Sequence, residues 1–136
     1  MSISINPYLT LDGNCEEAMK FWGDILNIKP EIMRMGDSPM EVPPEAKNRV
    51  MHSTLKADGF VLMASDSMLG QPVGKGGPVS LSLNFTTTEE QTRVWNRLAE
   101  GGTVTMPLGD MFWGRFGMLV DKFGIKWMLN HQPPQK

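Results

Sequence analysis

The stretch EEAMKFW at residues 16–22 recurs as EEQTRVW at residues 89–95. Both copies follow the pattern Glu-Glu-x-x-basic-apolar-Trp, and they start 73 residues apart, 89 minus 16. Similarity between two segments of one chain indicates a duplicated structural unit, which constrains the architecture more strongly than local propensity does. The chain is therefore expected to consist of two similar halves, each built around one of these segments.

Both copies carry the signals of a helix start. Asn14 with Glu17, and Thr87 with Glu90, place a short polar acceptor three residues before a carboxylate, which is the capping-box pattern. Apolar side chains then recur at helical spacing, so each predicted helix has one face to bury. The two stripes are Ala18, Phe21, Trp22, Ile25 and Leu26 in the first helix, and Gln91, Val94, Trp95 and Leu98 in the second.

Strand-like segments precede and follow each helix, most of them with the alternation of apolar and polar residues that is typical of half-buried strands. Tight turns are predicted at Asp58-Gly59 and at residues 121–124. The element order is therefore βαβββ, twice. The predicted strands are 3–11, 29–35, 49–57 and 60–65 in the first half, and 79–85, 103–108, 116–120 and 125–131 in the second.

Two stretches rich in Pro and Gly interrupt this pattern, and neither is expected to form regular structure. The stretch 36–48 is a lid, a partner-contact arm or a tolerated surface insertion. The second stretch separates the halves. The predicted organisation is a single domain, 1–136, with module one at 1–65, a linker at 66–77, module two at 78–131 and a C-terminal tail at 132–136.

Composition excludes several classes of function. The 136 residues include 13 Lys plus Arg and 15 Asp plus Glu, so no basic surface for nucleic acid or anionic lipid is expected. No apolar run approaches the ~18 residues of a membrane-spanning helix, and no secretory signal is recognised. The single cysteine, Cys15, cannot form an internal disulfide. A cytoplasmic location is expected.

Several segments together resemble the PhnB-like branch of the vicinal-oxygen-chelate superfamily, which also contains glyoxalases, bleomycin-resistance proteins and extradiol dioxygenases. The resemblance covers nearly the whole chain and implies an α+β, glyoxalase-like fold. Two modules would pair into a curved mixed sheet with a concave pocket face and the helices outside. The reaction is not implied, because one scaffold hosts many functions. The segments are INPYLTLDGNCEEAMKFW, MRMGD, VMHSTL, LMASD, VSLSLNF and TVTMPLGDMFWGRFGMLVDKFGIKWMLN.

The resemblance also implies where a metal would bind, since metal-dependent relatives carry a His or Gln on the first strand of each module and a Glu on the last. The first-strand positions fall at Asn6 or Pro7 and at Ser80, and the last-strand positions at Met63 and Met128. A thioether is a poor ligand except for soft ions such as copper(I). We therefore predict no metal and no other cofactor.

The stretch DMFWGRFG at 110–117 is predicted to join two strands near the mouth of the concave surface. Phe112 and Trp113 offer flat apolar area and Arg115 offers a fork of donors, which suit an anionic or aromatic small molecule. Alternatively, the aromatics cover a sheet edge and Arg115 pairs with Asp110 or Asp121 at the surface. The ligand-pocket candidates are Tyr8, His52, Met63, Ser80, Ser82, Phe112, Trp113, Arg115 and Met128.

Catalytic motifs are weak in this sequence. Cys15 lies in the first turn of a helix, but no base is paired with it, so a buried small hydrophobe is the expectation. Ser80 and Ser82 lack a G-x-S-x-G elbow. His52 is either a structural histidine or a pocket residue on a polar strand face. The methyltransferase label of some relatives finds no support, because LDGNCEEA contains no G-x-G fingerprint.

The favoured interpretation is a metal-independent binder of a small molecule. The alternatives are a metal-dependent lyase, isomerase or oxygenase with non-standard ligands, and a dimeric protein with a vestigial pocket. A homodimer is expected, because a two-fold interface would cover exposed sheet edges. No nucleic-acid or membrane partner is expected.

Overall fold

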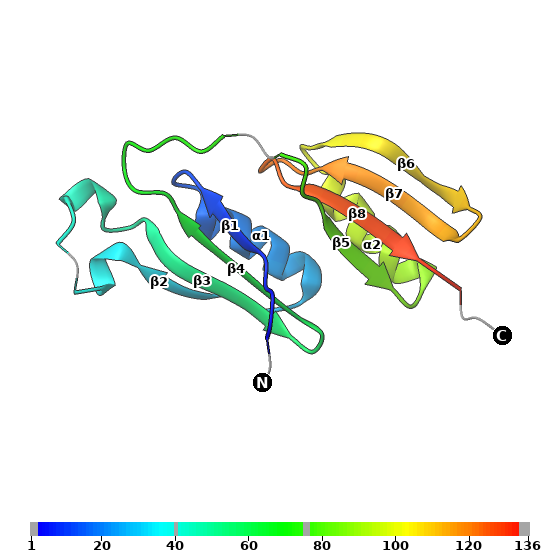
Figure 1. Ribbon diagram of the computed structural model, residues 1–136, viewed down its shortest axis with the longest axis horizontal. Coiled ribbons are helices and arrows are strands. Elements are labelled where there is room, and N and C mark those ends of the chain that lie inside the picture. The colour runs from blue at the N-terminus through cyan, green and yellow to red at the C-terminus, as the bar shows by residue number, and fades with distance from the viewer. Residues whose placement is uncertain (1–2, 40, 75–76, 134–136) are drawn as a thin grey trace. The chain divides into compact units, whose positions relative to one another are not determined.

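The structure, a computed structural model, describes residues 3–39, 41–74 and 77–133 (Figure 1). The chain forms two compact units, unit 1 (Met1–Gly74) and unit 2 (Lys75–Lys136). The boundary between them falls inside the predicted linker. Two residues of that linker, 75–76, and residues 134–136 of the predicted tail lie outside the described residues.

Unit 1 contains one helix and a four-stranded mixed sheet. Strand β1 is parallel to β4, and β4, β3 and β2 are antiparallel neighbours, giving the order β1-β4-β3-β2. Helix α1 lies against one face of this sheet (Figure 1). The elements are β1 (Tyr8–Leu11), α1 (Cys15–Leu26), β2 (Glu31–Arg34), two 3₁₀ turns, η1 (Met35–Asp37) and η2 (Pro44–Ala46), β3 (Val50–Ala57) and β4 (Phe60–Asp66).

Unit 2 has the same element order and a matching sheet. Strand β5 is parallel to β8, and the strand order is β5-β8-β7-β6. Helix α2 packs on one face of this sheet. The elements are β5 (Leu81–Phe85), α2 (Thr88–Ala99), β6 (Thr103–Met111), β7 (Gly114–Val120) and β8 (Lys126–His131). The α+β class predicted from the sequence is confirmed.

The strand register aligns the two units. Tyr8 pairs with Met63 in unit 1, and Ser82 pairs with Met128 in unit 2, so the first strands are offset by 74 residues, 82 minus 8. The helices are offset by only 73, because unit 1 has one more residue between strand and helix. Gly13, at φ +87°, lies in that longer loop.

This offset settles the counterpart of Ser80 in unit 1. Subtracting 74 from 80 gives Asn6, so Pro7 is not the equivalent residue. Both Asn6 and Ser80 lie just before the first strand of their unit rather than within it.

The first strand predicted in each half was too long at its start, whereas β6 and β7 extend beyond the predicted 103–108 and 116–120, so that only residues 112–113 of the stretch 110–117 connect them. Strand β1 begins at Tyr8, and Ile3 and Ile5 lie outside it, with Ile5 93% exposed. Pro7 precedes the strand and has no N–H to donate to a sheet ladder. Val79 likewise lies outside β5 and is 73% exposed. Alternation in the sequence therefore continued beyond the paired backbone.

The two helix starts differ from each other. Thr87 caps α2 as predicted, since its side chain accepts a hydrogen bond from Glu90 N at 3.2 Å. The prediction for Asn14 is wrong, because its side chain makes no capping bond. At α1 the buried carboxylate of Asp66 accepts from Gly13 N at 2.8 Å and from Cys15 N at 3.0 Å. Its other oxygen accepts from the backbone N of Val50 at 2.8 Å, so one side chain joins three segments.

Each helix buries its apolar stripe against its own sheet. Removing a leucine-sized side chain from water contributes about 1.5–3 kcal/mol, so burial of these stripes stabilises the packing of each helix on its sheet. Close approach is visible at Gly117 on β7, where an added Cβ would lie 2.7 Å from the Trp95 ring. The buried helix residues include Cys15, Ala18, Met19, Trp22 and Ile25 in α1, and Gln91, Val94 and Leu98 in α2.

The turn predictions are confirmed, with one difference in the loop at 36–48. Gly59 and Gly124 adopt positive φ values, +97° and +85°, in the turns before β4 and β8. Two short 3₁₀ turns, η1 and η2, lie at the start of the loop 36–48 and within it, although no regular structure was predicted there.

No helix among the described residues is long and apolar enough to span a membrane.

Candidate functional site

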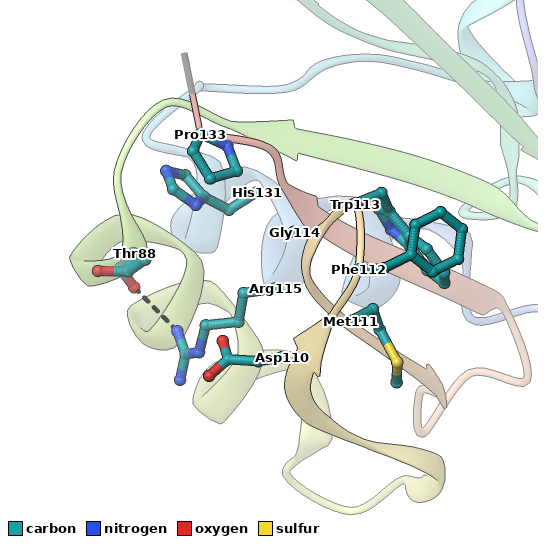
Figure 2. Close-up of a pocket in the computed structure, with 9 residues that line it drawn as sticks. All are labelled: Thr88, Asp110, Met111, Phe112, Trp113, Gly114, Arg115, His131 and Pro133. Carbon is teal, nitrogen blue, oxygen red and sulfur yellow. Dashed lines mark hydrogen bonds between the residues drawn. The ribbon is translucent and has the colours of Figure 1, made fainter. Parts of the chain in front are cut away.

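A pocket of about 340 Å³ lies in unit 2, where β6 and β7 meet (Figure 2). A neighbouring hollow of about 420 Å³ shares Thr88 and Arg115 with it and adds Glu89 and Thr92. The pocket is lined by Thr88, Asp110, Met111, Phe112, Trp113, Gly114, Arg115, His131 and Pro133.

The β6–β7 hairpin places two aromatic side chains at its tip. Met111 pairs with Gly114, which leaves Phe112 and Trp113 as the two turn residues. Gly114 has φ +153°, and a Cβ there would collide with the carbonyl oxygen of His131. Only glycine lets β7 pass this close to the end of β8.

Trp113 is fixed in place, whereas Phe112 is presented to solvent. The indole Nε1 donates to Oδ1 of Asn130 at 3.1 Å, and the indole ring meets Phe116 edge-on with centroids 5.6 Å apart. Phe112 packs edge-on against Trp113 at 4.8 Å but is 99% exposed. Such edge-to-face pairs are favourable for aromatic rings. The hairpin tip therefore carries an apolar surface, of which the Trp113 ring is held by Asn130 and Phe116.

Arg115 is anchored to the first turns of α2. Its Nη1 donates to Thr92 Oγ1 at 2.8 Å, to Gln91 Oε1 at 3.3 Å and to the Thr88 carbonyl at 3.4 Å. Gln91, which is fully buried, donates in turn from Nε2 to the carbonyls of Arg115 at 2.8 Å and Leu129 at 3.2 Å. These bonds hold the guanidinium in one orientation at the pocket wall.

Trp113 and Arg115 therefore point to different sides of the hairpin, as Figure 2 shows. Successive residues of a strand face opposite sides of the sheet, so Arg115 faces α2 while Phe116, which contacts Trp113, faces away from it. The alternative pairing of Arg115 with Asp110 or Asp121 is wrong. Among the residues that the structure describes, Arg115 forms no ion pair.

Three other candidates meet on the sheet of unit 1, on the face opposite α1. The Tyr8 hydroxyl lies 2.9 Å from His52 Nδ1, and His52 Nε2 lies 3.2 Å from Thr54 Oγ1. Met63 is the register partner of both Tyr8 and Thr54. Both ring nitrogens of His52 therefore lie within hydrogen-bond distance of a hydroxyl group. Tyr8 is about half exposed, so this group of side chains reaches the solvent.

The remaining candidates lie outside the pocket. Ser82 and Met128 are register partners in unit 2, on the face opposite α2, and Ser80 precedes β5. The sequence missed Thr88 and Gln91 as neighbours of Arg115. Their spacing of three residues on a predicted helix places them on one face of it. This spacing is the feature of the sequence that could have indicated a shared partner.

The four positions at which the resemblance implies metal ligands do not fit a divalent ion here. They hold an amide at Asn6, a hydroxyl at Ser80 and thioethers at Met63 and Met128. Divalent first-row ions prefer imidazole, carboxylate or thiolate donors. Within the described ranges, no three His, Cys, Asp or Glu side chains are grouped to hold a metal.

Cys15 is a buried thiol. The residue is completely buried, and its Sγ lies 3.5 Å from the Ser53 hydroxyl. Burial raises the pKa of the thiol to about 11, so it is protonated at neutral pH. The prediction of a buried small hydrophobe is confirmed.

Known proteins resemble this chain along almost its whole length. A solved structure, protein PA1353 from Pseudomonas aeruginosa, is 41% identical, with a TM-score of 0.89 over 98% of this chain and 100% of that one. A second, from Bacillus cereus, is described as a putative 3-demethylubiquinone-9 3-methyltransferase, PhnB protein. It is 29% identical, with a TM-score of 0.77 over 95% of this chain and 99% of that one.

Protein YjdN of Escherichia coli (strain K12) is 30% identical over 96% of this chain and 99% of its own length. Glyoxalase and bleomycin-resistance structures below 20% identity share the fold alone. The family model described as 3-demethylubiquinone-9 3-methyltransferase matches residues 3–130. The chain therefore belongs to this PhnB-like family, and it shares the fold of the glyoxalase and bleomycin-resistance structures.

Proposed function

We propose that this protein binds a small molecule, without a metal, in the pocket at the β6–β7 hairpin. The observation that carries the proposal is the juxtaposition of an aromatic turn and an anchored arginine around one hollow of about 340 Å³. Small-molecule pockets commonly have volumes of ~300–1,000 Å³ and are lined by apolar groups with a few placed polar ones.

The exposure of Phe112 supports a ligand-binding role. Hairpin turns usually carry Gly, Asn or Asp, because those residues readily adopt the positive φ angles of the turn and are small or polar enough to be exposed to water. Here the turn carries two aromatics, and one of them is 99% exposed. Leaving apolar area in water costs about 25 cal/mol per Å², which a ligand resting on the ring would recover in part.

No reaction is assigned. A methyltransferase, the activity named in the family description, needs a methyl-donor cofactor. The loop after β1, where a glycine-rich cofactor-binding turn would lie, has one glycine, Gly13. The backbone N–H groups of Gly13 and Cys15 already donate to Asp66. These donors are committed to the fold, which argues against a cofactor in that loop.

The second candidate function is a metal-dependent lyase, isomerase or oxygenase with non-standard ligands. Tyr8, His52 and Met63 are the side chains that favour it, because they gather on one sheet face. Both His52 nitrogens are already engaged, which weakens the case. Near-stoichiometric metal in purified protein that disappears in the His52→Ala variant would replace the first proposal with this one.

We further propose that residues 1–136 form one glyoxalase-like domain built from an internal repeat. We also propose that the protein is a cytoplasmic homodimer. The matching strand orders of the two sheets support the repeat. Val104 and Met106, half exposed on edge strand β6, support an interface, because exposed edges are prone to pair. Light scattering after size-exclusion chromatography should give twice the mass of the chain; a monomer at micromolar concentration contradicts the dimer.

The direct test is a thermal-shift screen of small molecules, since a ligand that binds the folded state raises Tm. The variants Trp113→Ala and Arg115→Gln should abolish the shift. Matched controls are Phe60→Ala, an exposed aromatic of unit 1, and Arg93→Gln, an arginine of α2 that pairs with Glu90. Equal shifts in all four variants would show that ligands bind elsewhere.

A further inference from the structure

Some N–H donors of the Arg115 guanidinium have no acceptor among the described residues. We infer that the ligand of the proposed pocket carries a carboxylate, which accepts hydrogen bonds from Nε and Nη2 of this side chain. The inference rests on the proposed function and adds the chemical class of the ligand. A guanidinium has five N–H donors in a rigid fork. All hydrogen bonds that the Arg115 guanidinium makes within residues 3–39, 41–74 and 77–133 leave from Nη1, so the three N–H groups on Nε and Nη2 have no protein acceptor there.

The anchoring of Nη1 gives these donors a fixed direction. Thr92 and Gln91 hold Nη1, and Gln91 is itself held by two strand carbonyls. A long arginine side chain normally loses rotamer freedom when it binds a ligand, and that cost is reduced where the protein has already ordered it. A carboxylate matches the fork with two parallel bonds, whereas a single acceptor does not.

Two acidic side chains restrict the charge of the ligand. Asp110, the register partner of Arg115, lines the pocket, and Glu89 lines the adjoining hollow. Together with one guanidinium they give a negative formal charge, so general attraction does not hold an anion here and the directed bonds of the fork must do so. A singly charged carboxylate is therefore favoured over a doubly charged phosphate, because repulsion grows with the charge.

The two aromatic side chains of the pocket restrict the part of the ligand that is attached to the carboxylate. Phe112 and Trp113 line the same pocket from the far side of the hairpin. Because the rings and Arg115 lie on different sides of the hairpin, a flat apolar group has to extend around the turn to reach the rings while its carboxylate binds Arg115. The ligand class is thus an aromatic or similarly flat monocarboxylic acid.

The test is an NMR titration of the full, ¹⁵N-labelled chain with matched acids and amides. The probes are benzoate against benzamide, indole-3-acetate against indole-3-acetamide, and phenyl phosphate. The signals observed are Nε–H of Arg115 and Nε1–H of Trp113, assigned with Arg115→Lys and Trp113→Phe. At least one acid should shift both signals and bind about tenfold more tightly than its amide, since charge-assisted bonds are the stronger ones.

Variants separate the fork from general charge. Arg115→Lys keeps the positive charge but should remove the preference for the acid, because an ammonium lacks the fork. Thr92→Val, which removes the 2.8 Å anchor, should reduce the preference, while Thr92→Ser should retain it. Arg93→Lys on the same helix is the control and should change nothing.

The outcomes separate a failure of the carboxylate inference from a failure of the proposed pocket. If amides bind as tightly as acids, or Arg115→Lys keeps the preference, the carboxylate inference is wrong while the pocket remains a binding site. Tighter binding of phenyl phosphate than of the acids also overturns it. If no probe shifts either signal at millimolar concentration, the inference and the proposed pocket fail together.

Discussion

Arg115 Nη1 donates to the Thr92 hydroxyl at 2.8 Å, which ties strand β7 to the second helix of the chain. Gln91, one residue earlier, strengthens this connection through the carbonyls of β7 and β8. The arrangement explains how an arginine at the end of a hairpin can be both structural and available. One terminal nitrogen bonds to the fold, while Nε and Nη2 have no acceptor among the described residues, and the side chain lines the pocket.

Replacing Gln91 with Leu should destabilise the protein. The carbonyl oxygens that Gln91 satisfies would lose a partner in a buried site, at a cost of about 1–3 kcal/mol. Urea unfolding measures the change, with Asn96→Ala, on the exposed side of the same helix, as the control. An unfolding free energy equal to that of Asn96→Ala would show that the bridge contributes nothing.

The start of α1 should depend on Asp66 and not on Asn14. Asp66→Ala removes the acceptor of three backbone N–H groups and should cost about 1–3 kcal/mol or more. Asn14→Ala should change the unfolding free energy by less than about 0.5 kcal/mol, while Thr87→Ala at the other helix should cost about 1 kcal/mol. Comparable losses for Asn14→Ala and Thr87→Ala would contradict the assignment of the caps.

Gly117→Ala should destabilise unit 2 through a collision with the ring of Trp95. The added methyl would lie 2.7 Å from that ring, and overpacking of this kind costs about 1–3 kcal/mol. The double variant Gly117→Ala with Trp95→Leu should lose less than the sum of the two single changes, because the residues share one contact. Strict additivity in thermal unfolding would argue against the contact.

Glu16 should contribute to stability in a pH-dependent way. Its hydrogen bond to Arg34 and a further one to Lys20 lower the pKa from 4.5 to about 2. Because the folded-state pKa is depressed, the contribution is present above about pH 4.5 and is lost as the pH falls towards 2. The pair is about one-third exposed, so the effect should be small and should shrink in salt.

The comparison for this prediction is Glu16→Gln against the unaltered protein. Urea unfolding at neutral pH should show a modest loss for the variant, and the difference should vanish near pH 2. A difference that persists at pH 2 with the same size would mean that the packing of Glu16, not its charge, is responsible.

The sequence predicted the βαβββ order and the hairpin glycines because those features depend on residues close together in the chain. It did not predict the cap of α1, since Asp66 lies 51 residues from Cys15. It also extended the first strands to Ile3 and Val79, because alternation alone does not reveal whether a partner strand is present.

The candidate site was predicted in part. Phe112, Trp113 and Arg115 do line one pocket. The direction of Arg115 could not be foreseen, since its partners lie 23 to 27 residues away on a helix face. Tyr8 and His52 were both named as candidates, but their hydrogen bond joins residues 44 positions apart and needed the sheet register.

The central claim is that the β6–β7 hairpin pocket binds a small molecule without a metal. The most direct measurement is a ¹⁵N–¹H NMR titration of chelator-treated protein with the compounds that raise Tm. The account predicts that signals from residues 110–115 and the Trp113 indole shift, with the same affinity before and after chelation. Shifts confined to other residues, or binding that disappears with the chelator, would contradict it.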